Sequence, residues 1–426
     1  MKLIEQILAK NNVREALNRV VSNKGASGID GMKVEELRDY MNANWTSIKQ
    51  SILERRYKPA PVRRVEIPKP NGGVRKLGIP TVVDRTLQQS IVQALTPIFE
   101  AEFQENSYGF RPGRSCEQAV QKLLAYLNEG AEWIVDIDLE KFFDNVPQDK
   151  LMSYVGRVIQ DPDTESLIRK YLKSGVMDHD LYEATELGTP QGGNLSPLLS
   201  NVMLNELDKE LVRRGLRYVR YADDCVIAVR SEASAKRVMH SVAQWIERVL
   251  GLKVNATKTH VCRPSKLKYL GFGFYKSPQT KQWTARPHED SVAKFVRKLK
   301  KLCKRSWSIS MTARITMLNR VIRGWINYFS IGSMKGKMVG IDEHLRTMLR
   351  KVIWKQWKTP QKRAWGLRKL GICNDLAKLT SYSGDRYEWV VRRTCVVRAI
   401  SKDVLARRGL ESCLDYYAIR HSLKTN

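Results

Sequence analysis

Helical and strand-like spacings of apolar residues alternate along the first part of the chain. Helical spacing comes first, and a glycine-bearing loop at residues 25–31 interrupts it. The apolar positions of this opening stretch are Ile4, Ile7, Leu8, Val13, Ala16, Leu17, Val20 and Val21. Short strand-like segments and further helical segments then alternate. The pattern predicts a mixed α/β region.

Two of the strand-like segments lie close together, at residues 64–67 and 74–77. The residues between them are basic and include Gly72 and Gly73, which favour a turn. The segments therefore predict two strands joined by a basic turn.

Acidic residues occur where other apolar strands end. Asp138 directly follows an apolar strand at residues 133–137, and Asp223 and Asp224 lie between two further strand segments. These two segments are residues 217–221 and 225–229. Because Asp is disfavoured within strands, we expect Asp223 and Asp224 to occupy the tight turn of a hairpin.

After residue 290 the spacing of apolar residues is helical throughout, and this predicts a bundle of helices. Three stripes are expected to form its core: Val292, Phe295, Val296, Leu299 and Leu302; Ile315, Leu318, Ile322, Trp325 and Phe329; and Leu345, Leu349, Val352 and Trp354. A polar stretch with two prolines at residues 276–290 predicts a linker. We therefore expect an α/β domain at residues 1–275 and a helical domain at residues 276–426.

The charge of the chain is strongly positive and unevenly distributed. The 426 residues include 74 Lys and Arg against 44 Asp and Glu, a formal net charge of +30. Residues 276–426 hold 34 Lys and Arg against 10 Asp and Glu, so this region carries +24 and the rest of the chain +6. Such self-repulsion is not expected of an enzyme for small neutral substrates, and it indicates a nucleic-acid partner.

The sequence contains no apolar run long enough for a transmembrane helix and no secretory signal, so we expect a cytoplasmic protein without a membrane partner. Its seven cysteines are scattered, without the spacing of a zinc site or the pairing of a disulfide framework. We expect them to be reduced thiols.

The acidic residues at the strand ends are the strongest candidates for chemistry. If their strands are neighbours in one antiparallel sheet, Asp138, Asp223 and Asp224 converge. Clustered carboxylates repel one another unless a cation neutralises them, and hard oxygen ligands select Mg²⁺. Two such ions could stabilise the attacking and leaving oxygens of a phosphoryl displacement. By itself, an Asp-Asp pair in a hairpin more often marks a solvated turn.

Motifs around these aspartates resemble those of reverse transcriptases, in the same order along the chain. The sequence Tyr221-Ala222-Asp223-Asp224 is similar to the family's signature. The other matching segments are residues 134–144, 189–199, 251–259 and 269–272. Asp144, which ends the first of them, is expected to have a structural role.

Within that family the chain most resembles the reverse transcriptases of bacterial group II introns, also called maturases. The segments that carry this closer resemblance are residues 23–31, 67–70, 108–115 and 323–329. It weakens after about residue 370. The resemblance implies a right-hand polymerase, with fingers and palm in the α/β domain and a helical thumb or maturase domain that binds RNA.

The resemblance also assigns roles to the aspartates. It implies that Asp138, Asp223 and Asp224 are the catalytic carboxylates and hold two Mg²⁺ ions, with the backbone carbonyl of Leu139 as a further ligand. Asp136 is the competing candidate, because it lies on the same face of the strand as Asp138.

Other residues are expected to contact the incoming nucleotide. Lys69 and Arg75 flank the basic turn and can reach a triphosphate. Gln191 can place an amide near the nucleotide and the template base. The resemblance implies that Phe143 stacks beneath the sugar. Lys258 is a candidate general acid for the leaving pyrophosphate, with purely electrostatic support as the alternative.

The expected reaction is addition of dNTPs to the 3′-OH of a DNA or RNA primer on an RNA template. Binding of the group II intron RNA, which would assist splicing and retromobility, is the expected companion activity. One alternative is an RNA-binding splicing factor with a vestigial polymerase. Others are retron, diversity-generating, defence-associated or domesticated reverse transcriptases.

Overall fold

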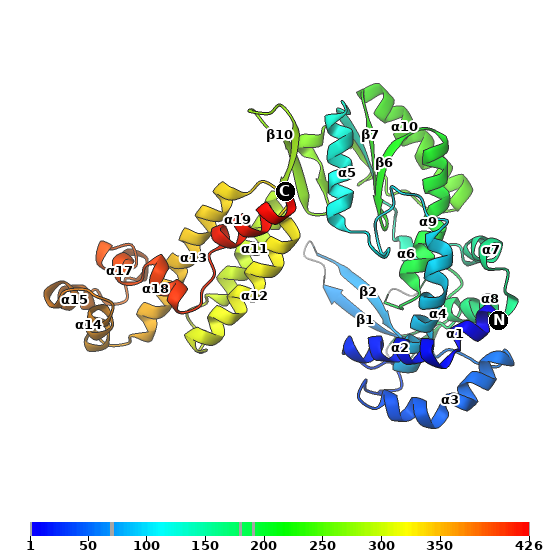
Figure 1. The fold of residues 1–426 in the computed structure, drawn as a ribbon, viewed down its shortest axis with the longest axis horizontal. Coiled ribbons are helices and arrows are strands. Elements are labelled where there is room, and N and C mark those ends of the chain that lie inside the picture. Colours follow the sequence, from blue (N-terminus) through cyan, green and yellow to red (C-terminus); the bar gives the residue numbers. More distant parts are fainter. Residues whose placement is uncertain (1, 69–71, 179–180, 190–191, 426) are drawn as a thin grey trace. The chain divides into compact units, whose positions relative to one another are not determined.

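A computed structural model describes residues 2–68, 72–178, 181–189 and 192–425. The chain forms two compact units, unit 1 up to Arg263 and unit 2 from Pro264 (Figure 1). The boundary predicted between residues 275 and 276 lies inside unit 2, at the end of a strand.

Unit 1 begins with helices α1 (Leu3–Ile7), α2 (Lys10–Ser22) and α3 (Leu37–Leu53). The opening helical stretch is thus divided between α1 and α2. The predicted glycine loop joins α2 to α3 and packs against the start of α4 (Val82–Glu100). A Cβ atom on Gly28 would lie 2.6 Å from the Cα of Thr81, so only glycine permits this approach.

The predicted strand pair is confirmed, with longer strands than expected, and residues 69–71 of the predicted basic turn lie outside the described residues. Strands β1 (Val62–Pro68) and β2 (Val74–Ile79) pair antiparallel. Strand β4 (Val176–Asp178) pairs parallel with β1, and β5 (Leu181–Glu183) continues the sheet in the order β2-β1-β4-β5.

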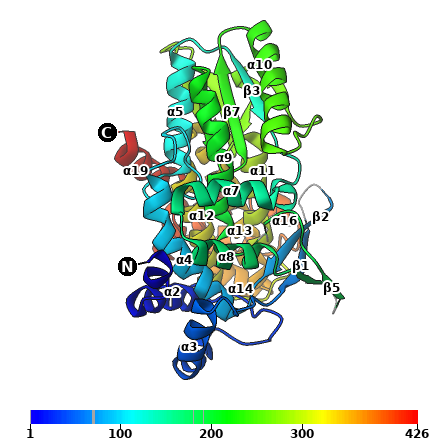
Figure 2. The same ribbon diagram turned by 90° about the vertical axis from the view of Figure 1, so that its right-hand side faces the viewer.

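A second sheet of unit 1 has the order β6-β7-β3-β8, and its neighbouring strands are antiparallel. Its strands are β3 (Trp133–Ile137), β6 (Arg217–Tyr221), β7 (Asp224–Val229) and β8 (His260–Cys262). Helices α5 (Cys116–Asn128) and α10 (Glu232–Trp245) lie beside β3 and β7 in Figure 2, and a π-helical turn at Ile246–Leu250 extends α10.

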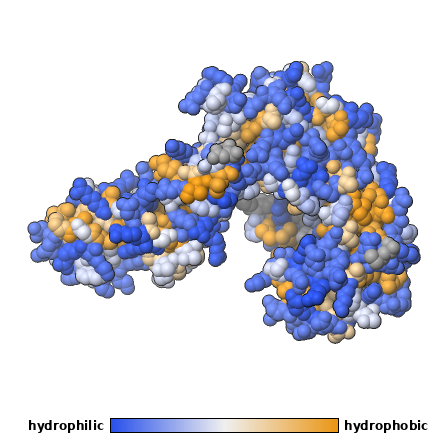
Figure 3. All heavy atoms as spheres, in the orientation of Figure 1, coloured by the Kyte–Doolittle hydropathy of each residue, from blue (hydrophilic) through white to orange (hydrophobic). Residues whose placement is uncertain are grey.

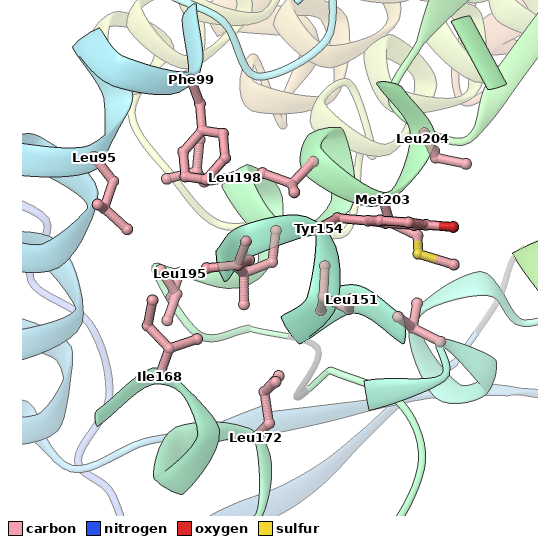
Figure 4. Close-up of a cluster of buried hydrophobic side chains, with 14 of the residues drawn as sticks. Leu95, Phe99, Leu151, Tyr154, Ile168, Leu172, Leu195, Leu198, Met203 and Leu204 are labelled. Atoms are coloured by element: carbon pink, nitrogen blue, oxygen red, sulfur yellow. The ribbon is translucent and has the colours of Figure 1, made fainter. Parts of the chain in front are cut away.

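The core of unit 1 runs from the first helices to the second sheet, and part of it lies among α4, α7 (Gln148–Ile159), α8 (Pro162–Leu172) and α9 (Ser196–Arg213). Figure 4 shows side chains from these helices and from the residue before α9 packed together, including Leu95, Phe99, Leu151, Tyr154, Ile168, Leu172, Leu195, Leu198, Met203 and Leu204. The same core includes Val135 and Ile137 of β3 and Ile227 of β7, so the second sheet packs directly on it, and α9 contacts β6.

Unit 2 begins with a short 3₁₀ helix (Pro264–Lys266) and a sheet of β9 (Lys268–Tyr269), β10 (Phe272–Lys276) and β11 (Trp283–Pro287). The predicted linker therefore contains the turn and second strand of the β10–β11 hairpin. This sheet belongs with the helices that follow it, because the Ser333 N–H donates to the Ala285 carbonyl at 2.8 Å.

The helical remainder of unit 2 is confirmed. Its elements are α11 (Glu289–Leu302), α12 (Met311–Phe329), α13 (Lys335–Gln356), α14 (Pro360–Lys369), α15 (Asn374–Ser381), α16 (Tyr387–Val390), α17 (Thr394–Ala399), α18 (Lys402–Arg407) and α19 (Cys413–Thr425). The first two stripes meet where Trp325 stacks on Phe295, with ring centroids 4.4 Å apart. The third stripe of apolar residues is buried.

The surface seen in Figure 3 is mostly hydrophilic, with apolar residues over α19, where Ile419 and Leu423 are exposed. Within the described residues, none of the helices combines the length and the apolar character needed to cross a membrane. All seven cysteines, which lie in the described part of the chain, are free thiols.

Candidate functional site

The hairpin that carries the two adjacent aspartates has a two-residue turn. Tyr221 pairs with Asp224, which leaves Ala222 and Asp223 as the turn. Ala222 has a φ of +56°, the left-handed conformation that such a turn requires at its first position. The prediction that both aspartates lie in the turn is therefore wrong for Asp224, which begins β7.

The pairing of β3 with β7 brings the third aspartate to the same end of the sheet. Ile137 pairs with Cys225, so the next residues toward this end are Asp138 on one strand and Asp224 on the other. Desolvation raises the pKa of the Asp224 carboxyl to about 6, and the nearby charges of Asp223, Asp136 and Asp138 add to this effect. The carboxylates predicted from the sequence to converge thus lie within electrostatic reach of one another.

Asp136 belongs to the same electrostatic cluster. It lies between Val226 of β7 and His260 of β8. Desolvation raises its pKa to about 6, His260 opposes this rise, and the charge of Asp138 adds to it. Asp136 therefore gains a proton more readily than an exposed aspartate, but Asp224 does so equally, so the pKa does not separate Asp136 from the other carboxylates.

Backbone and side-chain contacts from the segment before β8 hold Asp138 in place. Its N–H donates to the Thr259 hydroxyl at 3.1 Å, and its carbonyl accepts the Asn255 N–H at 2.8 Å. The Lys258 ammonium lies 3.2 Å from the Asp138 carboxylate. Lys258, the candidate general acid, is thus brought to the aspartates and partly neutralises their charge.

The donor set suits a hard divalent cation. Its ligands would be carboxylate oxygens and the backbone carbonyl of Leu139, the residue that follows Asp138. Carboxylates that raise each other's pKa are those that a cation would stabilise. Among the described residues, no group of three or more His, Cys, Asp or Glu side chains is arranged so that it could hold a metal ion. The residues present fit Mg²⁺ in chemistry.

A cavity of about 210 Å³ adjoins Phe143, at the start of α6 (Phe142–Asn145). Phe142 is 2% exposed and belongs to the core, whereas Phe143 is half-buried and lines the cavity. Arg64, Lys76 and Asp144 also line it. Gly188 closes one side, where a Cβ atom would lie 2.7 Å from the Phe143 carbonyl oxygen.

The predicted triphosphate contacts are only partly described. Lys69 and Gln191 lie outside the described residues. Arg75 is exposed on β2, where it pairs with Ile67 of β1. The cations that do line the cavity are Arg64 and Lys76, which sequence reasoning missed. Arg64 and Lys76 lie on the same face of the paired strands, because Arg64 pairs with Gly78, two residues from Lys76. The period of two along each strand is the signal that could have found them.

Comparison with family models agrees with this arrangement. Residues 67–274 match the model described as reverse transcriptase (RNA-dependent DNA polymerase), and residues 292–371 match the group II intron maturase-specific domain. The fold and the aspartate cluster thus lie in an RNA-directed DNA polymerase domain that a helical maturase region follows. The predicted fold class is confirmed.

The chain is also similar to curated proteins. Protein YkfC of Escherichia coli K12 is 34% identical over 300 residues, which are 61% of this chain and 79% of that protein. The group II intron-encoded protein LtrA of Lactococcus lactis is 35% identical over 249 residues, 56% of this chain and 40% of LtrA. The chain belongs to the group II intron reverse transcriptase/maturase family. Reverse transcriptases generally use divalent metal, and the two domains imply binding of a nucleic-acid template and of intron RNA.

Proposed function

We propose that this chain is an RNA-directed DNA polymerase encoded by a group II intron. It adds dNTPs to a primer 3′-OH and binds the intron RNA to assist splicing and retromobility. The observation that carries the proposal is the electrostatic cluster of Asp138, Asp223 and Asp224 where β3 and β7 meet. An RNA-binding splicing factor with a vestigial polymerase would have no need of these carboxylates.

In the proposed mechanism the aspartates and the Leu139 carbonyl hold two Mg²⁺ ions. The chemistry that the bound ions supply is stabilisation of the attacking 3′-oxygen and of the leaving pyrophosphate. Lys258, beside Asp138, provides positive charge or a proton for the pyrophosphate. Arg64 and Lys76, together with Lys69 and Arg75, supply cations for the triphosphate, and Gln191 contributes to the template and nucleotide site.

Extension of a DNA primer on an RNA template, with dNTPs and Mg²⁺, tests the proposal directly. We expect a product that requires all four dNTPs and the RNA template. A folded protein that binds structured RNA but extends no primer, with Mg²⁺ or with Mn²⁺, would instead support the vestigial-polymerase alternative.

Phe143 is expected to exclude ribonucleotides, because its ring lines the cavity where a 2′-hydroxyl would collide with it. Forcing extra atoms into a packed site costs ~1–3 kcal/mol, or roughly 5- to 150-fold in relative rate. We predict that Phe143→Ala raises the ratio of kcat/KM for ATP to that for dATP by a factor in this range. Single-nucleotide extension on an RNA template measures it.

Phe142 provides the matched control for this selectivity. Because Phe142 is buried in the core, Phe142→Ala should lower thermal stability and leave the ratio nearly unchanged. A folded Phe143→Ala protein with the wild-type ratio would remove Phe143 from the nucleotide site.

The basic side of α11 is expected to contact RNA phosphates. Lys298 and Lys301 are exposed on this helix, and Lys304 is exposed just after its end. Changing all three to Ala should reduce the magnitude of the log–log slope of RNA affinity against salt by roughly two to three units, at ~0.7–0.9 per phosphate contact. Filter binding of a structured intron RNA over a salt series gives the slope.

Three exposed lysines of unit 1 that lie on separate helices, Lys10, Lys49 and Lys236, form the control set. Their replacement by Ala removes the same charge and should change the slope by less than one unit. Equal slopes for the two triple variants would mean that α11 is merely solvated.

A further inference from the structure

Arg220 is a completely buried arginine one residue before the tyrosine of the catalytic hairpin. Its side chain is 0% exposed, as is that of Asp208 of α9, with which it forms an ion pair. The proposed mechanism gives it no role. A charge in such a position is costly to bury and requires an explanation.

Every N–H group of the Arg220 guanidinium has an acceptor. The Nε atom donates to the Asp208 carboxylate at 2.9 Å, and Nη2 donates to the Ser107 hydroxyl at 2.7 Å and to Asp208. The Nη1 atom donates to the Asn201 side-chain oxygen at 3.1 Å and to the backbone carbonyl of Ala222 at 2.9 Å. The last contact reaches the turn that carries Asp223.

The same network ties the turn to a loop at residues 106–109. The Arg220 backbone N–H donates to the Asn106 carbonyl, and the Arg220 carbonyl accepts the Tyr108 N–H, each at 2.9 Å. Asn201 donates to the Gly109 carbonyl at 2.8 Å. Gly109 touches the turn backbone, because a Cβ atom on it would lie 2.9 Å from the Tyr221 carbonyl carbon.

Stability alone does not explain this arrangement. Replacing a buried ion pair by apolar residues of similar size is often neutral or stabilising, so α9 could pack on β6 without a charge. What an apolar pair cannot do is donate to the Ala222 carbonyl in the left-handed turn. The feature that sets this ion pair apart is its hydrogen bond to the turn beside the carboxylates.

We propose that Arg220 is a positioning residue that fixes the Ala222–Asp223 turn, and with it the carboxylates of Asp223 and Asp224, in the orientation needed for polymerisation. This inference rests on the proposed function. A lysine would keep the charge and could pair with Asp208, but its three donors on one nitrogen cannot reach acceptors on α9, the loop and the turn together.

Two variants test the role. Arg220→Lys keeps the buried charge. Arg220→Met combined with Asp208→Leu removes both charges and leaves no unpaired ion. For each we expect kcat to fall about 10- to 100-fold, the loss that a displacement of about 1 Å in the site can cause. The KM for dATP and the affinity for primer–template should stay within threefold, because neither ligand touches Arg220.

Binding of Mn²⁺ to the protein without nucleic acid, measured by electron paramagnetic resonance, gives a readout besides activity. Misplaced carboxylates should raise the dissociation constant for Mn²⁺ at least threefold in both variants. Thermal unfolding shows whether they remain folded. A stable double variant with wild-type kcat and Mn²⁺ affinity would make Arg220 merely structural and overturn the proposal. If the double variant does not fold, a wild-type kcat and Mn²⁺ affinity in Arg220→Lys would overturn it.

Arg111→Lys is the matched control. Arg111 is also buried, pairs with Glu100 and donates to the Ser107 carbonyl of the same loop, but it makes no contact with the turn. The kcat of Arg111→Lys should stay within threefold of the wild-type value. An equal loss of kcat in Arg111→Lys and Arg220→Lys would assign the effect to the loop and overturn the role of Arg220. A wild-type protein that extends no primer contradicts the proposed function instead.

Discussion

Replacing Asp223 by Asn is expected to abolish primer extension, with a fall in kcat of ~10³-fold or more, while the affinity for structured RNA stays within a few fold. Asn keeps the size of the side chain but removes the charge that would hold the metal beside the reacting phosphate. The turn geometry should survive, because it depends on the backbone of Ala222 and on Arg220. Steady-state extension and filter binding measure the two quantities.

The control for this substitution is Asp149→Asn. Asp149 is 92% exposed in its ion pair with Arg169, so the same chemical change there should leave kcat unaltered. Equal loss of extension and of RNA affinity in Asp223→Asn would indicate misfolding. Extension that persists with ample Mg²⁺ would remove Asp223 from the catalytic set.

Gly109→Ala should destabilise unit 1 and impair catalysis together. A Cβ atom at this position would overlap the backbone nitrogen of Ala222, and backbone cannot rotate away as a side chain can. Overpacking of this kind costs ~1–3 kcal/mol, and values near the upper end correspond to a fall in Tm of roughly 6–12 °C. Calorimetry and primer extension on the same preparation measure both effects.

Gly340 of α13 provides the contrast, because a Cβ atom at this position would point into open space, with no other element within 4 Å. Gly340→Ala should keep or raise the Tm, since alanine favours the helix by about 1 kcal/mol. A Gly109→Ala protein as stable and active as wild type would mean that the loop does not contact the turn in solution.

Much of the secondary structure could be predicted because its signals are local. The strands at residues 133–137 and 217–221 have the bounds that their apolar pattern predicts. The position of Asp224 was misjudged, because the composition around the hairpin does not distinguish a two-residue turn from a longer one. Pairing with Tyr221 across the hairpin determines it.

The contacts that complete the site could not be predicted from local pattern. Arg220 looks like any polar residue of an alternating strand, and its partners Asn201 and Ser107 are far from it in the chain. The sheet of β9, β10 and β11 was missed because prolines and polar residues at 276–290 also fit a linker. The contacts of Arg220 join segments that no sequence window contains, whereas the β10–β11 hairpin is local and its composition hides it.

The register of β3 against β7 also has a consequence for how this protein can change in evolution. The meeting of Asp138 with Asp224 depends on strand pairing and not on the length of chain between them. Insertions in the connection between α9 and β6, where Gly215 is exposed, should therefore be tolerated, because lengthening a loop costs little free energy. Deletion of one residue within β3 or β7 would turn its carboxylate to the opposite face of the sheet.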